Sequence, residues 1–285
     1  MIRNDFAVFI LSHGRADNVI TKKTLDSLGY SGSWYIVIDN EDKQSDLYYR
    51  NFGHDHVIMF DKAAEAQWMD AADLSEKRNT VFYARNICFK LAEKLGIRFF
   101  LELDDDYNNF MFRYAEGKKL QWKQFSDLDS LFEAMLDFLE ISGAHSVALC
   151  QGGDFIGGVG NSRFHAGLIR KAMNTFFCDV SRPFQFRGRI NEDVSTYTCE
   201  ANKGKAFFSV TCAMVNQAQT QKQAGGMTDI YLDTGTYVKS FYTIIHAPQA
   251  VKISSMNSNH ARIHHLIDYN HCCPKILSEK YRKAE

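Results

Sequence analysis

Four short apolar runs recur along the first third of the chain, and they constrain the fold more than any other feature. Each is nearly continuous rather than alternating, so each predicts a strand that is buried on both faces. Between the third and fourth runs, apolar residues from Phe82 to Leu95 repeat at helical spacing. Strands of this kind that alternate with helices indicate an α/β fold, a mostly parallel central sheet flanked by helices. The four runs are Phe6–Leu11, Trp34–Ile38, His56–Phe60 and Phe99–Leu103.

Three consecutive aspartates, Asp104, Asp105 and Asp106, follow the last of these runs. Like charges at this spacing raise one another's pKa unless a cation lies between them. Clustered oxygens are the usual ligands of hard divalent cations, so the triplet predicts a metal that holds a phosphate-bearing substrate. Alternation along the chain would point Asp105 away from a metal shared by the other two. The alternative is an acidic loop that merely follows a strand.

Further polar residues gather at the ends of the predicted strands. The loop Ser12–Arg15 follows the first strand, and Asp39 ends the second. Ligands of parallel α/β sheets bind outside the carboxyl ends of the strands, so these residues and the aspartates are expected on one rim. A second acidic group, Asn191–Asp193, lies far along the chain. It fits either a helix N-terminus or a general base that accepts a proton from an attacking hydroxyl.

The second half of the chain is less regular. The glycine-rich loop Gly157–Gly160 matches neither the Walker pattern nor the dinucleotide-binding pattern. No repeat and no linker composition divides the chain, so residues 1–285 are expected to form one domain with an elaborated C-terminal half. The patterns there predict helices over 128–141 and 237–246, strands over 146–150, 207–215 and 250–253, and a long polar loop over 216–228.

Two late segments offer weaker signals. His260 and His264 are four residues apart and would share a helix face, as metal ligands or in polar packing and substrate contact. A zinc site at 271–273 is disfavoured, because no second pair of ligands has suitable spacing. The segment Arg182–Arg189 mixes arginines with aromatic residues. That mixture suits nucleic-acid contact, although a strand with alternating faces would look the same.

The composition restricts the class of protein. No apolar run reaches the roughly 18 residues that a membrane span needs, and no secretory signal is evident, so no membrane partner is expected. Seven cysteines without framework spacing indicate reduced thiols and a cytoplasmic location. The net charge of −1 means that nucleic acid would have to meet a local basic patch.

Taken together, these residues resemble the GT-A glycosyltransferases of the inverting, family 2-like type. The resemblance runs through Ala84-Arg85-Asn86, the aspartate triplet and the later Asn-Glu-Asp. It implies that the triplet binds Mn²⁺ or Mg²⁺ on the diphosphate of a nucleotide-sugar, above all a UDP-sugar. Asp193 would be the base, and Asp39 would bind the nucleotide base.

The same resemblance implies a set of site residues. A late histidine often completes the metal shell, and His246, His260, His264 and His265 are the candidates here. Catalysis would fall to Asp193 and Glu192. The metal would be bound by Asp104, Asp106 and His264. The donor would be bound by Ser12, Arg15, Asp39, Arg85, Asp104, Asp105, Gly157 and Gly158.

A narrower resemblance is to the TET-associated glycosyltransferases of bacteriophages. Ser12–Asn18, Thr220–Thr228 and Arg262–His265 are similar to motifs of that family. The resemblance implies sugar transfer onto 5-hydroxymethylpyrimidines in DNA, foremost 5-hydroxymethylcytosine, in the host cytoplasm. Residues 1–106 would form the nucleotide-binding half and 107–285 the acceptor-binding half, with the polar loop 219–228 as an acceptor clamp. Reaching such a base in a duplex requires flipping it or binding a single strand.

Three other functions fit parts of the pattern. The near-neutral charge suits a glycosyltransferase that acts on a glycan, a lipid or a small molecule. A catalytically silent module of the same fold could bind a nucleotide or DNA. A nucleotidyltransferase is a third alternative. The oligomeric state is not indicated.

Overall fold

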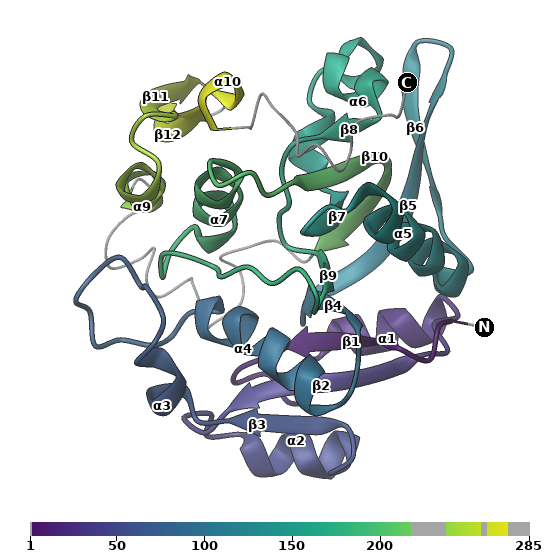
Figure 1. The fold of residues 1–285 in the computed structure, drawn as a ribbon. Helices are drawn as coiled ribbons and strands as arrows, with labels where there is room; N and C mark the ends of the chain where they lie inside the picture. Colours follow the sequence, from purple (N-terminus) through teal and green to yellow (C-terminus); the bar gives the residue numbers. More distant parts are fainter. Residues whose placement is uncertain (1, 218–237, 258–260, 273–285) are drawn as a thin grey trace, which may run out of the picture.

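The computed structural model describes residues 2–217, 238–257 and 261–272. Ten strands of the described chain form one sheet in the order β3-β2-β1-β4-β9-β7-β10-β5-β6, with β8 beside β10 (Figure 1). The first four strands in chain order are parallel to one another. They are β1 (Phe6–Leu11), β2 (Ser33–Asp39), β3 (Val57–Phe60) and β4 (Phe99–Asp104). The predicted α/β fold with a central sheet is confirmed.

The rest of the sheet mixes directions. β7 and β10 are parallel, whereas β9 is antiparallel to both β4 and β7, and β10 is antiparallel to β5. The sheet is therefore continuous from the first half of the chain into the second. The added strands are β5 (Tyr107–Glu116), β6 (Lys119–Gln124), β7 (Ser146–Cys150), β8 (Leu168–Ile169), β9 (Phe176–Asp179) and β10 (Phe207–Gln217).

Helices cover both faces of the sheet. One core packs α1 (Ile20–Ser27), α2 (Ser45–Phe52) and α5 (Leu128–Ser142) against one face. The other core packs α4 (Phe82–Lys94) and α7 (Glu192–Ala201) against the opposite face, with α3 (Lys62–Ala66) beside them. The remaining elements are the 3₁₀ turns η1 (Gly152–Phe155) and η2 (Gly158–Gly160), α6 (Ser162–Ala166), α9 (Val238–His246), α10 (Tyr269–Cys272), and the separate pair β11 (Val251–Asn257) and β12 (Ala261–Ile267).

The strand sequences explain this layering. Along β1, Val8 and Ile10 belong to the first core, whereas Phe9 and Leu11 belong to the second. Successive side chains of a strand point to opposite faces, so a continuous apolar run must be covered on both. Removing both faces from water drives the two helical layers onto the sheet. The exception is Glu102, a fully buried carboxylate in the apolar run of β4.

Two local predictions are wrong. The histidine segment is the strand β12 rather than a helix, because it pairs along its whole length with β11. Arg182–Arg189 is not a strand. Its two phenylalanines are buried in the second core, and its arginines 187 and 189 form ion pairs with carboxylates.

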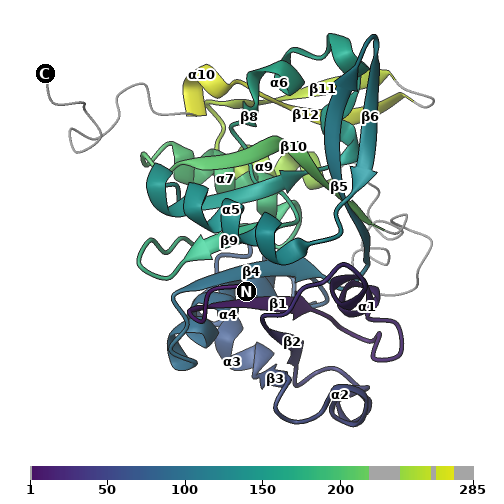
Figure 2. The same cartoon turned by 90° about the vertical axis from the view of Figure 1, so that its right-hand side faces the viewer.

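The sequence patterns also missed the hairpin of β5 and β6. Figure 2 shows it at one side of the molecule, with its tip at the outer edge. The polar loop 219–228 and His260 lie outside the described residues. Within the described part, no helix is long and apolar enough to cross a membrane, and the six described cysteines are free thiols.

Candidate active site

The site begins at the carboxyl end of β4. In the parallel pairing of β1 with β4, Leu11 lies beside Asp104, so both strands end at the same edge of the sheet. The hydroxyl of Thr21 in α1 donates to the backbone oxygen of Asp104 at 2.6 Å and accepts from the backbone N–H of Tyr107 at 2.9 Å. These contacts fix the acidic turn after β4 against α1.

Asp105 is tied to the loop that follows β1. Its carboxylate accepts hydrogen bonds from Ser12 Oγ at 2.5 Å and from Arg15 Nη1 at 2.8 Å. The hydroxyl of Tyr48 lies 2.7 Å from Ser12 Oγ and accepts from the backbone N–H of Arg15 at 2.9 Å. Burial raises the pKa of Asp105, although Arg15 opposes the rise. Protein groups therefore engage both carboxylate oxygens of Asp105.

Arg85 of α4 connects the two acidic groups of the sequence. Its Nη2 donates to Asp104 Oδ1 at 2.8 Å, and its Nε donates to Glu192 Oε1 at 3.1 Å. Glu102 Oε2 lies 3.5 Å from Nη1. Arg85 is only 1% exposed and lies over the ring of Phe176. Burial opposes its charge, but the neighbouring carboxylates outweigh burial and hold the pKa of Arg85 well above its ordinary value.

One guanidinium therefore faces three carboxylates, so negative charge exceeds positive charge around Arg85. Several acidic side chains in and beside this cluster have raised pKa values. Burial raises the pKa of Glu102 to about 8. Burial, together with the charge of Asp193, raises the pKa of Glu192 to about 7. Asp106 has a pKa of about 7, because of burial and the charges of Asp104 and Asp105. Its Oδ1 is buried and has no hydrogen-bond partner among the described residues. The cluster is short of positive charge.

Asp193 lies in the first turn of α7. Asn191 precedes the helix with a positive φ of 59° and donates its side-chain amide to Thr243 in α9 instead of capping. Asp193 Oδ1 accepts from the backbone N–H of Val194 at 2.7 Å. Burial raises the pKa of Asp193, while Arg85 lowers it less strongly. The group is thus a carboxylate whose proton affinity exceeds that of an ordinary aspartate.

A cavity of about 390 Å³ is lined by Asp104, Arg85 and Asp193, together with residues of η1, β10 and α9, whereas Asp105 and Asp106 do not line it. The structure therefore brings together Asp104 and Asp193, which are 89 positions apart in the sequence. A carboxylate with a raised pKa and the acidic end of β4 therefore line one cavity. The residues that line the cavity include Arg85, Asp104, Gly153, Glu192, Asp193 and Lys239.

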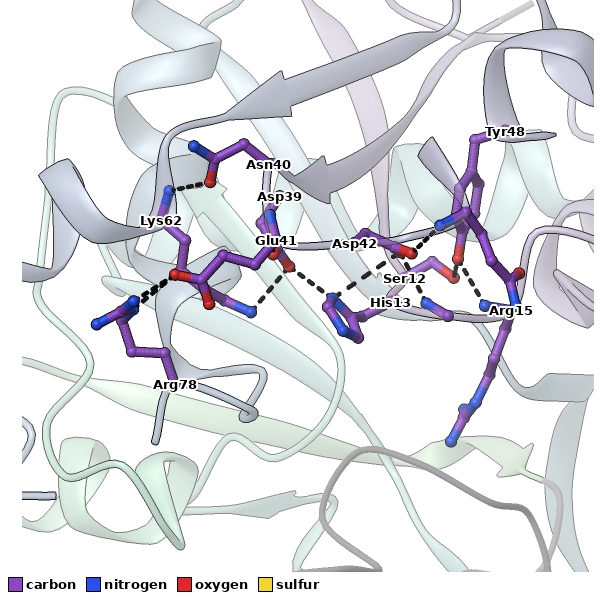
Figure 3. Close-up of polar contacts among 12 residues, drawn as sticks. Ser12, His13, Arg15, Asp39, Asn40, Glu41, Asp42, Tyr48, Lys62 and Arg78 are labelled. Atoms are coloured by element: carbon purple, nitrogen blue, oxygen red, sulfur yellow. Dashed lines mark hydrogen bonds and ion pairs between the residues drawn. The ribbon is translucent and has the colours of Figure 1, made fainter. Parts of the chain in front are cut away.

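Asp39 belongs to a different cluster, which Figure 3 shows around the ends of β1 and β2. Its carboxylate is 2.8 Å from His13 Nδ1 and 2.9 Å from Lys62 Nζ. Burial acts against its ionisation, but His13 and Lys62 outweigh it and lower the pKa of Asp39. The hydrogen bond to Asp39 raises the pKa of His13. Asp42 accepts from the backbone N–H of Gly14 at 2.7 Å. This cluster is balanced in charge.

Several predicted residues lie elsewhere. Gly157 and Gly158 do not line the cavity, and Gly152 and Gly153 line it instead. Among the described residues, no group of three or more His, Cys, Asp or Glu side chains could hold a metal, so His264 is not grouped with the aspartates. The rings of His264 and His265 are adjacent, with centroids 4.3 Å apart and planes tilted by 31°. His246 lies against Gly188.

Sequence reasoning missed four residues of these two clusters. Glu102 was read as part of an apolar run, and its position between Leu101 and Leu103 gave no signal of a buried partner. Lys239 lies in a segment that was recognised only as helical. His13 and Lys62 both follow the ends of predicted strands. Polar residues at the carboxyl ends of the strands were therefore the signal that could have found them.

The fold and the site define an α/β enzyme whose acidic residues lie at the carboxyl ends of parallel strands. The family model of the TET-associated glycosyltransferases matches residues 6–226. The chain belongs to this family, and it is therefore a nucleotide-sugar glycosyltransferase.

Among solved structures, residues 1–349 of TarS from S. aureus are similar, at 12% identity and a TM-score of 0.38, over 85% of this chain and 66% of that one. The glucosyl-3-phosphoglycerate synthase of Mycobacterium tuberculosis, solved with Mn²⁺, UDP and phosphoglyceric acid, is 9% identical with a TM-score of 0.46, over 92% of this chain and 86% of that one. Comparison with curated proteins found no match.

Proposed function

We propose that the protein is a metal-dependent, inverting glycosyltransferase that moves a sugar from a nucleotide-sugar, foremost a UDP-sugar, to 5-hydroxymethylpyrimidine in DNA, foremost 5-hydroxymethylcytosine. The observation that carries the proposal is the cavity lined by both Asp104 and Asp193, with Arg85 between their elements. The family match supports sugar transfer, and the family name suggests the hydroxylated base as acceptor.

In an inverting transfer, one displacement forms the new bond and breaks the old one. The acceptor hydroxyl oxygen attacks the anomeric carbon, its proton passes to the Asp193 carboxylate, and the nucleoside diphosphate leaves with the bonding electron pair. Burial raises the pKa of Asp193, which makes it a stronger base than a solvated aspartate. Glu192 is hydrogen bonded to Arg85 and so fixes the turn that presents Asp193.

The residues present fit a divalent cation. Asp106 Oδ1 is a buried oxygen without a partner in the described chain, and burial together with the neighbouring carboxylates raises the pKa of Asp106 to about 7. Asp104 and Asp106 would hold Mn²⁺ or Mg²⁺, which supplies charge neutralisation for the departing diphosphate. Ser12, Arg15 and Asp39 are proposed to lie along the nucleotide. Arg85 orients Asp104 through the bond to its Oδ1.

The deciding experiment incubates the protein with hydroxymethylated DNA and a panel of nucleotide-sugars, followed by mass spectrometry of the nucleosides. We expect a hexose added to the hydroxymethylated base, lost with a chelator and restored by Mn²⁺ or Mg²⁺. Unmodified DNA is the control acceptor. Donor hydrolysis without transfer to DNA would reject the acceptor. Transfer that persists after chelation would reject the metal.

The net charge of −1 favours one second candidate, a transferase that acts on a glycan or another small acceptor. The same assay separates the two, because that enzyme would label added glycans and leave the DNA unmodified. A catalytically silent module would release no nucleoside diphosphate from any donor.

A further inference from the structure

The hairpin of β5 and β6 carries three large aromatic side chains that the protein leaves in solvent. Phe112, Tyr114 and Trp122 are 41%, 37% and 54% exposed. The rings of Phe112 and Tyr114 stack, with centroids 6.0 Å apart and an interplanar angle of 19°. Trp122 lies across from Arg113 in the strand register and so on the other face, whereas Phe112 and Tyr114 share one face. Aromatic rings are among the groups that gain most from burial, so the exposed, stacked pair of Phe112 and Tyr114 indicates a surface that a partner covers.

The same hairpin is basic in an otherwise acidic protein. Residues 107–124 hold one arginine and three lysines against one glutamate, a net charge of 4 − 1 = +3. The whole chain carries −1, so the remaining residues carry −4. Lys118, Lys119 and Lys123 are exposed, and no ion pair of the described residues involves them. Lys123 lies directly across from Phe112 in the strand register. A polyanion that also offers flat rings would match both features.

The opposite face fixes the hairpin to the body of the protein. Met111 packs into a small core with Phe155, and Arg113 lies over the Phe155 ring at 4.8 Å. The hairpin is therefore a supported element and not a free tip.

The hairpin also starts at the candidate active site. Tyr107, the first residue of β5, places its hydroxyl 3.3 Å from Asp104 Oδ2. Seven residues of strand separate Tyr107 from Tyr114, which is about 24 Å at roughly 3.4 Å per residue. A strand of nucleic acid that leaves the site along β5 would therefore meet the exposed rings within several nucleotides.

We propose that the β5–β6 hairpin binds the acceptor DNA beside the modified base, with its aromatic rings stacked on unpaired bases and its lysines on phosphates. The inference rests on the proposed DNA acceptor. Aromatic stacking with a basic surface is how proteins bind single strands without reading sequence. A second copy of this chain fits less well, because a two-fold contact would bring two hairpins of charge +3 together.

The test measures anisotropy of a fluorescein-labelled single strand and of its duplex, neither of them hydroxymethylated. We expect Phe112→Ser with Tyr114→Ser to weaken single-strand binding tenfold to about a hundredfold, and duplex binding less. The triple variant Lys118→Gln, Lys119→Gln, Lys123→Gln should reduce the slope of log affinity against log salt by about 2, since each phosphate contact on a single strand contributes about 0.7.

Matched controls make the same changes elsewhere on the surface. Leu95→Ser with Ile141→Ser alters two exposed apolar residues, and Lys23→Gln, Lys43→Gln, Lys94→Gln removes three exposed lysines. Neither control should change binding. The hairpin variants should keep the wild-type melting temperature, which shows that the fold is intact.

The outcomes separate this inference from the proposed function. If the wild type binds the strand and the hairpin variants do not, the inference stands even where no donor labels DNA. If the wild type labels hydroxymethylated DNA and the hairpin variants bind and label it equally well, the inference alone is overturned. It is also overturned if the wild type does not bind the strand. A dimer that dissociates in the aromatic variant, with unchanged DNA affinity, would reassign the surface to self-association.

Discussion

Two clusters of buried charge follow parallel strands of the same sheet, and they are built in opposite ways. Around Asp39 at the end of β2, positive partners match the carboxylate, so its pKa is lowered. Around Arg85, a single guanidinium faces Glu102, Asp104 and Glu192. There the pKa of Glu102 rises to about 8 and that of Glu192 to about 7.

The difference predicts a supporting role for the Asp39 cluster and a reacting role for the Arg85 cluster. Balanced charges satisfy one another and fix the loop after β1, as Figure 3 shows for His13, Asp39 and Lys62. A cluster short of positive charge is completed only by protons or by a cation from outside, and perturbed pKa values of this kind concentrate at functional sites. We therefore expect substitutions in the Arg85 cluster to act on catalysis, and those in the Asp39 cluster to act on stability.

Asp193→Asn gives the largest expected effect. The amide keeps the shape of the side chain but cannot accept the proton, so turnover should fall by about 10²- to 10⁴-fold with donor affinity retained. Single-turnover transfer and calorimetric titration of the donor measure the two quantities. The exposed Asp55→Asn is the matched control. An unchanged turnover would remove Asp193 from the role of base and leave the Arg85 cluster without a proton acceptor.

Lys62→Met tests whether the Asp39 cluster contributes to the stability of the fold. It leaves the buried Asp39 with His13 as its only side-chain cation, so we expect a loss of about 3 kcal/mol in the free energy of unfolding. Lys62→Met combined with Asp39→Asn should lose less, because no unmatched charge remains. Urea denaturation measures both.

Arg78→Met is the control for Lys62→Met, since it breaks the more exposed pair with Glu41 and should cost at most about 1 kcal/mol. If Lys62→Met unfolds at the wild-type urea concentration and instead lowers turnover with donor affinity retained, the Asp39 cluster takes part in the reaction and the distinction between the clusters is lost.

The parallel part of the sheet could be predicted from the sequence almost to the residue. β1 was predicted as Phe6–Leu11 and β7 as Ser146–Cys150, and both bounds are those of the structure. Strands covered on both faces must be apolar throughout, so their limits show directly in the sequence. The hairpin of β5 and β6 was missed because it is half exposed, although the alternation around Gly117 was a usable signal.

The site could be predicted only in part, because its geometry depends on contacts distant in sequence. Asp104 and Asp193 were singled out separately, but their meeting depends on Arg85, which bridges β4 and α7. The histidine segment was assigned helical spacing because a period of four residues says nothing about cross-strand pairing. The segment forms strand β12 by pairing with β11, and no local sequence pattern reveals that pairing.

Glu102→Gln gives the most specific test of the charge deficit. An ordinary glutamate ionises near pH 4.5, whereas burial raises the pKa of Glu102 to about 8. Between these values the folded protein holds a proton that the unfolded chain has released, so the free energy of unfolding of the wild type falls as pH rises. Glutamine is neutral at every pH and removes this contribution.

The variant and the wild type should therefore melt at similar temperatures at pH 5, and the variant should melt higher at pH 8.5. Each kcal/mol of the difference corresponds to about 2–4 °C for a chain of this size. Asp106 and Glu192 also have raised pKa values, but they act equally in both proteins, so the difference between the two melting curves isolates Glu102. Parallel curves from pH 5 to 8.5 would mean that Arg85 neutralises Glu102 fully. The Arg85 cluster would then be balanced, as the Asp39 cluster is.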